Sequence, residues 1–213
     1  MKIELWEDVV CSWCGITNGR VNQALKEFPH LDEVEFVHRS FRLLPNAPEG
    51  QSYTFLQYMV EQGVPAQQVK KMAESVEQIA AADGQVPYHV LDNTIGNTAL
   101  AHEFLAWASA QGKQNQAWDL LFKAHFEDEA PLWSIEDLVP FATELGLNAG
   151  DARKALEERT FREQVEADQK AAHAAGAQGV PFIVIGGKYA LAGAQSKEAL
   201  LSAFSQVWTE LND

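Results

Sequence analysis

Strand-like sequence occurs only near the two ends of this 213-residue chain. Residues 2–6 (KIELW) alternate apolar and polar side chains, and residues 34–41 are rich in β-branched and aromatic residues, which is typical of strands. Residues 181–193 (PFIVIGGKYALAG) predict a hairpin around the Gly-Gly pair, because glycine tolerates the positive φ of a tight turn. A single small sheet therefore has to combine strands from both ends of the chain.

The sequence between these strands has the period of helices. Val21, Ala24, Leu25 and Phe28 form one apolar helical face, and Pro29 ends that helix. Further helices are expected over residues 53–61, from Pro65 through Ile79, over residues 94–110 and 114–126, over residues 134–145 with Ser134 as N-cap, from Asp151 towards Gly176, and after Ser196.

This order of elements predicts an α/β fold with an insertion. The strands belong to one discontinuous domain, made of residues 1–48 and 150–213, because a sheet of this size needs both groups of strands. Residues 49–149, in which we expect helices only, form an inserted helical domain.

Charge and hydropathy exclude several classes of partner. The chain has 30 acidic and 16 basic residues, a formal charge of −14, which is the wrong sign for a surface that binds nucleic acid or an anionic membrane. No apolar run reaches the 18 or so residues that span a bilayer. Glu4, Glu7 and Asp8 interrupt the region where a signal peptide needs apolar sequence, so we expect a cytoplasmic protein.

The only two cysteines, Cys11 and Cys14, lie where the first strand runs into the first helix. The N-terminus of a helix presents unpaired N–H groups and a partial positive charge, which favour a thiolate. Residues three apart on a helix face the same side. We therefore expect Cys11 to be the exposed nucleophile of a disulfide exchange and Cys14 to resolve the mixed disulfide.

Two other interpretations of the cysteines are weaker. Zinc needs four ligands, whereas the chain has one C-x-x-C pair and six scattered histidines, so no metal site is expected. Free cysteines also serve as small buried apolar residues. That role accounts less well for two cysteines at a junction of strand and helix.

Several segments together resemble a known family. The C-x-x-C pair follows the first strand, and GVPFIV (179–184) places a proline directly before a later strand. This arrangement resembles the thioredoxin fold, and the helical insertion resembles the DsbA family. The segments DVVCSWC (8–14), RSFRLLPNAP (39–48), NTALAH (97–102) and LAGAQ (191–195) resemble the cytoplasmic FrnE-type dithiol–disulfide oxidoreductases.

The resemblance implies further site residues. Pro181 would follow a cis peptide bond beside the cysteines, and the backbone of Val180 would pair with an extended substrate. Ser12 and Trp13, between the cysteines, would belong to the surface that contacts the substrate. No cofactor would be needed, because the Cys11–Cys14 dithiol is itself the redox centre.

The chain also departs from the family pattern. Strongly oxidising members have His before the second cysteine, and the Trp13 found here leads us to expect a weaker oxidant. Gly15 follows Cys14 where the subgroup often has an aromatic residue, which removes bulk near the dithiol. Leu5 occupies the position of the buried carboxylate of thioredoxins, so no general base is assigned. The role of His102 is left open.

These observations favour an enzyme that exchanges thiols and disulfides on a protein or small-molecule substrate and is recycled by glutathione or a thioredoxin system. One alternative, from the same structural superfamily, is a glutathione-dependent isomerase or transferase of the kappa or 2-hydroxychromene-2-carboxylate isomerase type. Those enzymes typically have serine near the position of Cys11, so the retained cysteines argue against it. A non-catalytic binding or chaperone module is the third interpretation.

Overall fold

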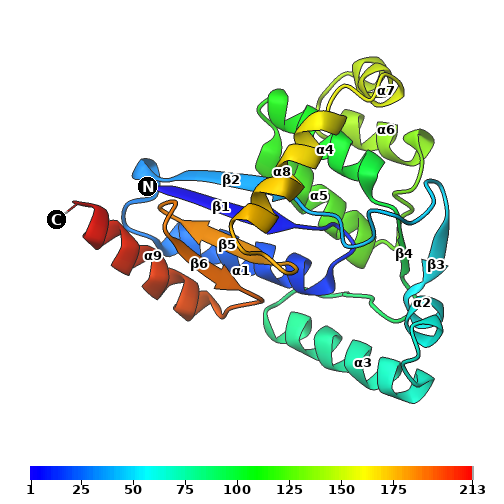
Figure 1. Cartoon of the computed structure of the whole chain (residues 1–213), viewed down its shortest axis with the longest axis horizontal. Coiled ribbons are helices and arrows are strands. Elements are labelled where there is room, and N and C mark those ends of the chain that lie inside the picture. Colours follow the sequence, from blue (N-terminus) through cyan, green and yellow to red (C-terminus); the bar gives the residue numbers. More distant parts are fainter. Residues whose placement is uncertain (213) are drawn as a thin grey trace.

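The computed structural model describes residues 1–212, and its central sheet takes strands from both ends of the chain (Figure 1). The strands are β1 (Lys2–Glu7), β2 (Glu35–Ser40), β5 (Phe182–Ile185) and β6 (Tyr189–Ala192), in the order β2-β1-β5-β6. β1 is parallel to β2 and antiparallel to β5, which forms a hairpin with β6. Gly186 and Gly187 have φ of 62° and 68° in the hairpin turn, so the expected sheet and hairpin are confirmed.

Helices cover both faces of this sheet. α1 (Ser12–Glu27) and α9 (Lys197–Asn212) pack on the face where Ile3 and Leu5 of β1 are buried. Trp6 points to the opposite face, where it packs with α8 (Arg162–Ala174) and donates a hydrogen bond from Nε1 to the Asp168 carbonyl (2.8 Å). Because side chains alternate along a strand, Glu7 lies on the same face as Leu5.

The middle of the chain is mainly helical, as expected. Its helices are α2 (Phe55–Glu61), α3 (Ala66–Ala82), α4 (Ala99–Ala110), α5 (Gln114–Phe126), α6 (Ile135–Glu144) and α7 (Ala149–Glu157). Ser134 is confirmed as the N-cap of α6, where its hydroxyl accepts from the Asp137 N–H (3.2 Å). Within residues 1–212, no helix is long and apolar enough to cross a membrane.

The expectation of helices only between residues 49 and 149 was wrong. β3 (Ser52–Thr54) and β4 (Thr94–Gly96) form a second, two-stranded antiparallel sheet, so α4 begins at Ala99 rather than at residue 94. A Cβ at Gly96 would lie 2.4 Å from the Gln51 carbonyl oxygen, so glycine allows the two backbones to approach. The domain boundaries near residues 48 and 150 stay a prediction.

The expectation of a helix that begins at Asp151 was also wrong. Asn148 is the N-cap of α7, and its Oδ1 accepts from the N–H groups of Gly150 (2.7 Å) and Asp151 (3.1 Å). An Asn three residues before Asp151 therefore starts the helix one turn earlier.

The same segment divides into α7 and α8, rather than forming one long helix. Arg159 interrupts it with a φ of 52°, in the left-handed region. Its guanidinium donates to both carboxyl oxygens of the buried Glu103 (2.7–3.0 Å) and to Glu49 (2.9 and 3.1 Å). Since residue 159 lies inside an otherwise helical pattern, these long-range ion pairs explain why local sequence did not indicate the break.

Candidate active site

Cys11 lies where β1 ends and α1 begins. The residues after Glu7 form a turn in which the Cys11 N–H donates to the Asp8 carbonyl (3.0 Å). Cys11 is the N-cap of α1, and its carbonyl accepts from the N–H groups of Cys14 (2.8 Å) and Gly15 (3.1 Å). The positive end of the helix dipole therefore lies at this thiol.

The two thiols have different environments. Both cysteines are free, and the Cys14 N–H donates to Cys11 Sγ (3.3 Å). Cys11 is 8% exposed, whereas Cys14 is completely buried. The two thiols thus differ in access: of the pair, Cys11 alone reaches the surface, although at 8% exposure it is exposed only relative to Cys14.

A segment from the far end of the sequence lies against Cys11. The peptide bond between Val180 and Pro181 is cis. The Cys11 thiol donates to the Val180 carbonyl (3.7 Å), and the Pro181 carbonyl accepts from the Gly193 N–H (2.9 Å). Because Pro181 leads directly into β5, which pairs with β1, the sheet brings residues 11 and 180 together.

The pKa of Cys14 lies well above that of an ordinary thiol. Burial is the main cause of this raised pKa. The hydrogen bond with Cys11, the charge of Cys11 and the charge of Glu7 raise the pKa further, and a hydrogen bond from the Asp8 backbone partly offsets the increase. In the reduced protein, Cys14 is therefore a neutral thiol. It needs a proton acceptor before it can attack a mixed disulfide.

A buried carboxyl, Glu7, interacts electrostatically with both cysteines and is paired with a buried imidazole. Burial raises the pKa of Glu7 well above its usual value, and the nearby charges of Cys11 and Asp119 add to this effect. Glu7 Oε1 lies 2.7 Å from His38 Nδ1, and burial lowers the pKa of His38 to about 3. The two groups therefore form a neutral pair in which protonated Glu7 donates to His38. Within residues 1–212, Glu7 Oε2 has no hydrogen-bond partner.

This neutral pair predicts a specific dependence of stability on pH. Between pH 4.5 and 6.5, the folded pair holds one proton on Glu7, and the unfolded chain holds one proton on His38. Folded and unfolded states therefore bind the same number of protons at these two residues, and the pair adds no pH dependence to the free energy of unfolding. Burial also lowers the pKa of His125 to about 4, and the unfolded form of this residue binds a proton below pH 6.5. Its contribution to stability is therefore lost as pH falls, by about 1.4 kcal/mol per pH unit.

In a Glu7→Gln variant, the contribution of His38 is no longer offset. The free energy of unfolding should then fall by about 1.4 kcal/mol more per pH unit than in the unaltered protein as pH decreases from 6.5 to 4.5. Urea unfolding across this window measures both slopes. Glu4→Gln, on the opposite face of β1, is the matched control, and equal slopes in all three proteins would contradict the neutral pair.

Three segments that the sequence analysis singled out meet at Asp8. Its Oδ1 lies 3.2 Å from His102 Nε2, and its Oδ2 accepts from the Leu43 N–H (2.7 Å). Asp8 and His102 are both completely buried. Asp8 therefore connects the turn between β1 and α1, just before the cysteines, to the loop after β2 and to α4. His102 bonds to this carboxylate, which gives it a positioning role in the fold.

The other predicted site residues also lie around Cys11. Trp13 is 38% exposed and lines a cavity of about 290 Å³ together with Val180, Pro181 and Gly193. The Ser12 carbonyl accepts a hydrogen bond from the Tyr88 hydroxyl (2.6 Å). The structure thus brings all six predicted residues together, while the contacts of Ser12, Trp13, Val180 and Pro181 with a substrate stay predictions.

Tyr88, which the sequence analysis missed, explains the glycine after Cys14. A Cβ at Gly15 would lie 2.4 Å from the Tyr88 hydroxyl oxygen. The Tyr88 ring stacks on Phe126 with centroids 4.5 Å apart, and its pKa is raised well above the usual value by burial, then by the charges of Cys11 and Cys14. The expected loss of bulk near the dithiol is therefore compensated by a side chain from a distant loop.

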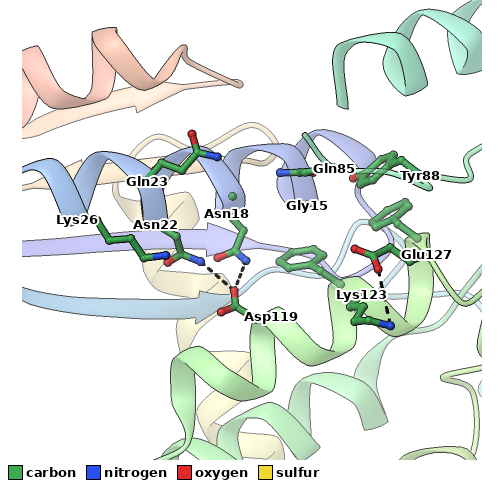
Figure 2. A pocket seen from close by; sticks show the side chains of 13 residues that line it. Gly15, Asn18, Asn22, Gln23, Lys26, Gln85, Tyr88, Asp119, Lys123 and Glu127 are labelled. Atoms are coloured by element: carbon green, nitrogen blue, oxygen red, sulfur yellow. Dashed lines mark hydrogen bonds and ion pairs between the residues drawn. The ribbon is translucent and has the colours of Figure 1, made fainter. Parts of the chain in front are cut away.

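A second, polar cleft of about 270 Å³ runs along α1 beside α5 (Figure 2). Figure 2 shows Asn18 and Asn22 of α1 directed at Asp119 of α5, whose Oδ1 accepts from both amides (2.7 and 2.9 Å). Lys26 and Lys123 also line it, but neither cysteine does. Among residues 1–212, no group of three or more His, Cys, Asp or Glu side chains is placed to hold a metal ion.

Comparisons with known proteins agree with this geometry. Residues 2–205 match the family model of the DSBA-like thioredoxin domain. The structure of a probable DsbA oxidoreductase from Streptomyces coelicolor is 32% identical and has a TM-score of 0.93, with 99% of this chain and 91% of that chain covered. The uncharacterized protein YwbO of Bacillus subtilis is 26% identical over 96% of both chains. A 2-hydroxychromene-2-carboxylate isomerase has a TM-score of 0.73 at 14% identity, with 100% of this chain and 98% of that chain covered, which shows a shared fold alone.

Proposed function

Because this chain belongs to the family of DsbA-like thioredoxin domains, we propose that it is a thiol–disulfide oxidoreductase whose reacting groups are Cys11 and Cys14. The observation that carries the proposal is the unequal environment of the two thiols. Cys11 reaches the surface at the N-terminus of α1, whereas Cys14 is enclosed within hydrogen-bonding reach of it through its own N–H. Such an arrangement suits one thiol for attack and the other for resolution.

In the first step, the Cys11 thiolate attacks one sulfur of a substrate disulfide. A bond forms between Cys11 Sγ and that sulfur, the substrate S–S bond breaks, and the other substrate sulfur leaves as a thiolate that takes up a proton from water. The carbonyl of Val180 lies beside Cys11, where an extended substrate can pair with the backbone before the cis proline. Ser12 and Trp13 contact the substrate from the other side.

In the second step, Glu7 first releases its own proton to water, and the resulting carboxylate takes the proton of Cys14, whose thiolate then attacks Cys11 Sγ. The bond between Cys11 and the substrate breaks, the second substrate sulfur leaves as a thiolate, and the Cys11–Cys14 disulfide forms. The charge of Cys11 raises the pKa of both Cys14 and Glu7. This charge disappears once Cys11 is bound in the mixed disulfide, so both protons are released more easily at the moment when resolution is needed.

One turnover transfers two electrons to the substrate and leaves the enzyme oxidised, so a reductant must restore the dithiol. We propose glutathione or a thioredoxin-type dithiol for this role, in the cytoplasm, and no bound cofactor. The sequence segments that resemble FrnE-type enzymes support an assignment to that subgroup. In the opposite direction, the same steps would oxidise a substrate dithiol, and the reduction potential decides which direction dominates.

A Cys11→Ser variant tests this proposal. In an insulin reduction assay with dithiothreitol, the unaltered protein should accelerate the reaction, and the variant should give the rate of dithiothreitol alone, because a serine hydroxyl does not exchange with disulfides. Thermal unfolding of the variant checks that it is folded. Equal acceleration by both proteins would contradict the role of Cys11.

The same assay addresses the isomerase alternative, which the shared fold with a 2-hydroxychromene-2-carboxylate isomerase keeps open. If neither protein accelerates insulin reduction and both bind glutathione tightly, the isomerase interpretation replaces the oxidoreductase proposal.

A further inference from the structure

The groups that handle the proton of Cys14 are closed off from solvent. The side chains of Glu7 and His38 have no exposed surface, and Cys14 is completely buried. Cys14 can attack only after its proton has left, and Glu7 can accept that proton only after releasing its own. Because a buried charge without a partner is costly, the proton needs a defined path to water.

The two carboxyl oxygens of Glu7 have different surroundings. Oε1 lies 2.7 Å from His38 Nδ1, so the proton of the neutral carboxyl is shared with the imidazole. Oε2 makes no hydrogen bond within residues 1–212. A carboxyl group placed in this way can give up a proton from Oε1 on one side and take up another at Oε2 on the other.

His38 extends from Glu7 to a cavity at the outer edge of β2. Its Nε2 lies on the opposite edge of the ring from Nδ1, and it also has no hydrogen-bond partner in the described part of the chain. His38 lines the cavity, as does Trp118, which stacks on the imidazole with centroids 5.3 Å apart. Since the imidazole is neutral and Nδ1 accepts from Glu7, the single ring proton of the reduced protein is on Nε2.

This β2-edge cavity is polar and large enough for water. Its volume is about 50 Å³, and one water molecule needs about 10–15 Å³. Polar side chains from three helices line it, namely Ser109, Gln114, Gln164 and Asp168. Gln164 is exposed, so the cavity lies at the surface of the molecule. A proton that reaches the far edge of the His38 ring therefore meets a site suited to water.

Two other ways out of the protein are less suitable. The surface around Cys11 is lined almost entirely by apolar side chains, and the substrate would cover it in the mixed disulfide. The polar cleft along α1 contains Asp119, which accepts from Asn18 and Asn22 and makes no hydrogen bond to Glu7 within residues 1–212. The negative charge of Asp119 acts on Glu7 from a distance and helps to retain its proton.

From this geometry we propose that His38 relays the Glu7 proton to water in the β2-edge cavity. The proposal rests on the proposed resolution by Cys14 and adds the route of its proton. The O–H bond at Glu7 Oε1 breaks as an N–H bond forms at His38 Nδ1, and the Nε2 proton passes to water. Glu7 Oε2 then takes the proton of Cys14, whose thiolate attacks Cys11 Sγ. Both relay groups are neutral before and after.

The relay is reset when the enzyme is reduced again. As a reductant thiol attacks Cys11, Cys14 leaves as a thiolate and takes the proton of Glu7 Oε2. Glu7 Oε1 then takes the proton of His38 Nδ1, and Nε2 takes one from water. The imidazole is therefore expected to hold its proton on Nε2 in the reduced protein and on Nδ1 in the oxidised protein.

Nitrogen NMR of protein labelled with ¹⁵N-histidine, measured in both redox states, tests this exchange of tautomers without any substitution. The two ring nitrogens of His38 should exchange their signals between the reduced and the oxidised protein. His125 is the internal control, because it is buried but has no hydrogen bond to Glu7, and its tautomer should stay the same. One and the same tautomer of His38 in both states would overturn the relay.

A His38→Gln variant tests the effect on the rate. A glutamine amide does not carry a proton from one side to the other, so the resolving step should slow by about 100-fold, while attack by Cys11 changes little. A peptide disulfide with 5-thio-2-nitrobenzoate measures both steps in a single turnover. Combining His38→Gln with Glu7→Gln should slow resolution no further than Glu7→Gln alone, because the two residues act in one path. His125→Gln is the matched control and should resolve at the unaltered rate.

The outcomes distinguish the relay from the function it serves. An unaltered protein that does not react with the peptide disulfide would overturn the exchange reaction itself. Slow resolution in Glu7→Gln but normal resolution in His38→Gln would overturn the relay and leave Glu7 as the proton acceptor. Equal slowing in His38→Gln and His125→Gln would show that loss of a buried imidazole, rather than a broken proton path, causes the effect.

Discussion

A Cys14→Ser variant is expected to stop after the first step and retain its substrate as a stable mixed disulfide on Cys11. Cys14 is completely buried, and the substitution keeps the N–H of residue 14 that donates to Cys11 Sγ, so Cys11 keeps its position and its backbone donor. Insulin reduction should fall to the rate of dithiothreitol alone, although the first step still occurs. Intact-mass measurement after incubation with a peptide disulfide should show one peptide bound per chain.

Cys11→Ser should behave differently, because it should neither accelerate insulin reduction nor retain a bound peptide. A Cys14→Ser protein that remains active in insulin reduction, or that binds no peptide, would contradict the assignment of Cys14 as the resolving thiol. Treatment of the trapped species with dithiothreitol should release the peptide and confirm that the bond is a disulfide.

Replacing Glu7 with glutamine is expected to slow resolution of the mixed disulfide by about 100-fold, the lower range for loss of a general base. Glutamine keeps the size of the side chain but cannot accept the proton of Cys14, whose raised pKa makes that transfer necessary. The first step involves Cys11 alone and should change little. Single-turnover kinetics with a cysteine peptide activated as its mixed disulfide with 5-thio-2-nitrobenzoate separates the two rates. Release of thionitrobenzoate reports attack by Cys11, and release of the peptide reports attack by Cys14.

Glu4→Gln is the control, because Glu4 lies on the same strand but faces away from the cysteines and pairs with Arg39 (2.8 Å). The resolving rate of the unaltered protein should increase with pH as Glu7 ionises, and Glu7→Gln should lose this dependence. A resolving rate that is the same in Glu7→Gln and Glu4→Gln would exclude Glu7 as the proton acceptor.

Much of the fold was predictable, because it depends on local patterns. The alternation of residues 2–6, the helical face that begins at Val21, and the Gly-Gly turn at residues 186–187 each specify an element without reference to the rest of the chain. The sheet then follows, since strands near both ends have few other partners. The position of Pro181 beside Cys11 did not follow from these patterns; it was implied by the family resemblance.

The errors occurred where distant residues decide the local structure. β3 and β4 have three residues each, which is too short for a recognisable period, and they form because their backbones pair across about 40 residues of sequence. Arg159 ends a helix through ion pairs with Glu49 and Glu103. Neither effect has a local signal.

Glu7 is a different case, because a signal was present. No general base was assigned from the sequence, because Leu5 occupies the position of the thioredoxin carboxylate and none of the acidic residues flanking it was selected. Strand alternation places Glu7 on the same face as Leu5, two residues closer to Cys11. What the sequence did not provide was its partner: the parallel register pairs Leu5 with His38, which brings the imidazole to the Glu7 carboxyl.

The ion pairs of Arg159 also bear on how the inserted helices move. Glu49 lies in the connection from the sheet to the inserted helices, and Arg159 lies in the connection back towards the sheet. The ion pair between them therefore links the two connections. Because both of its ends are held, we expect the inserted segment to move by small rotations about these ends rather than by a large hinge motion. The far helices α2 and α3 would then widen or narrow the space above Cys11, while the strand and the thiol beneath them stay in place.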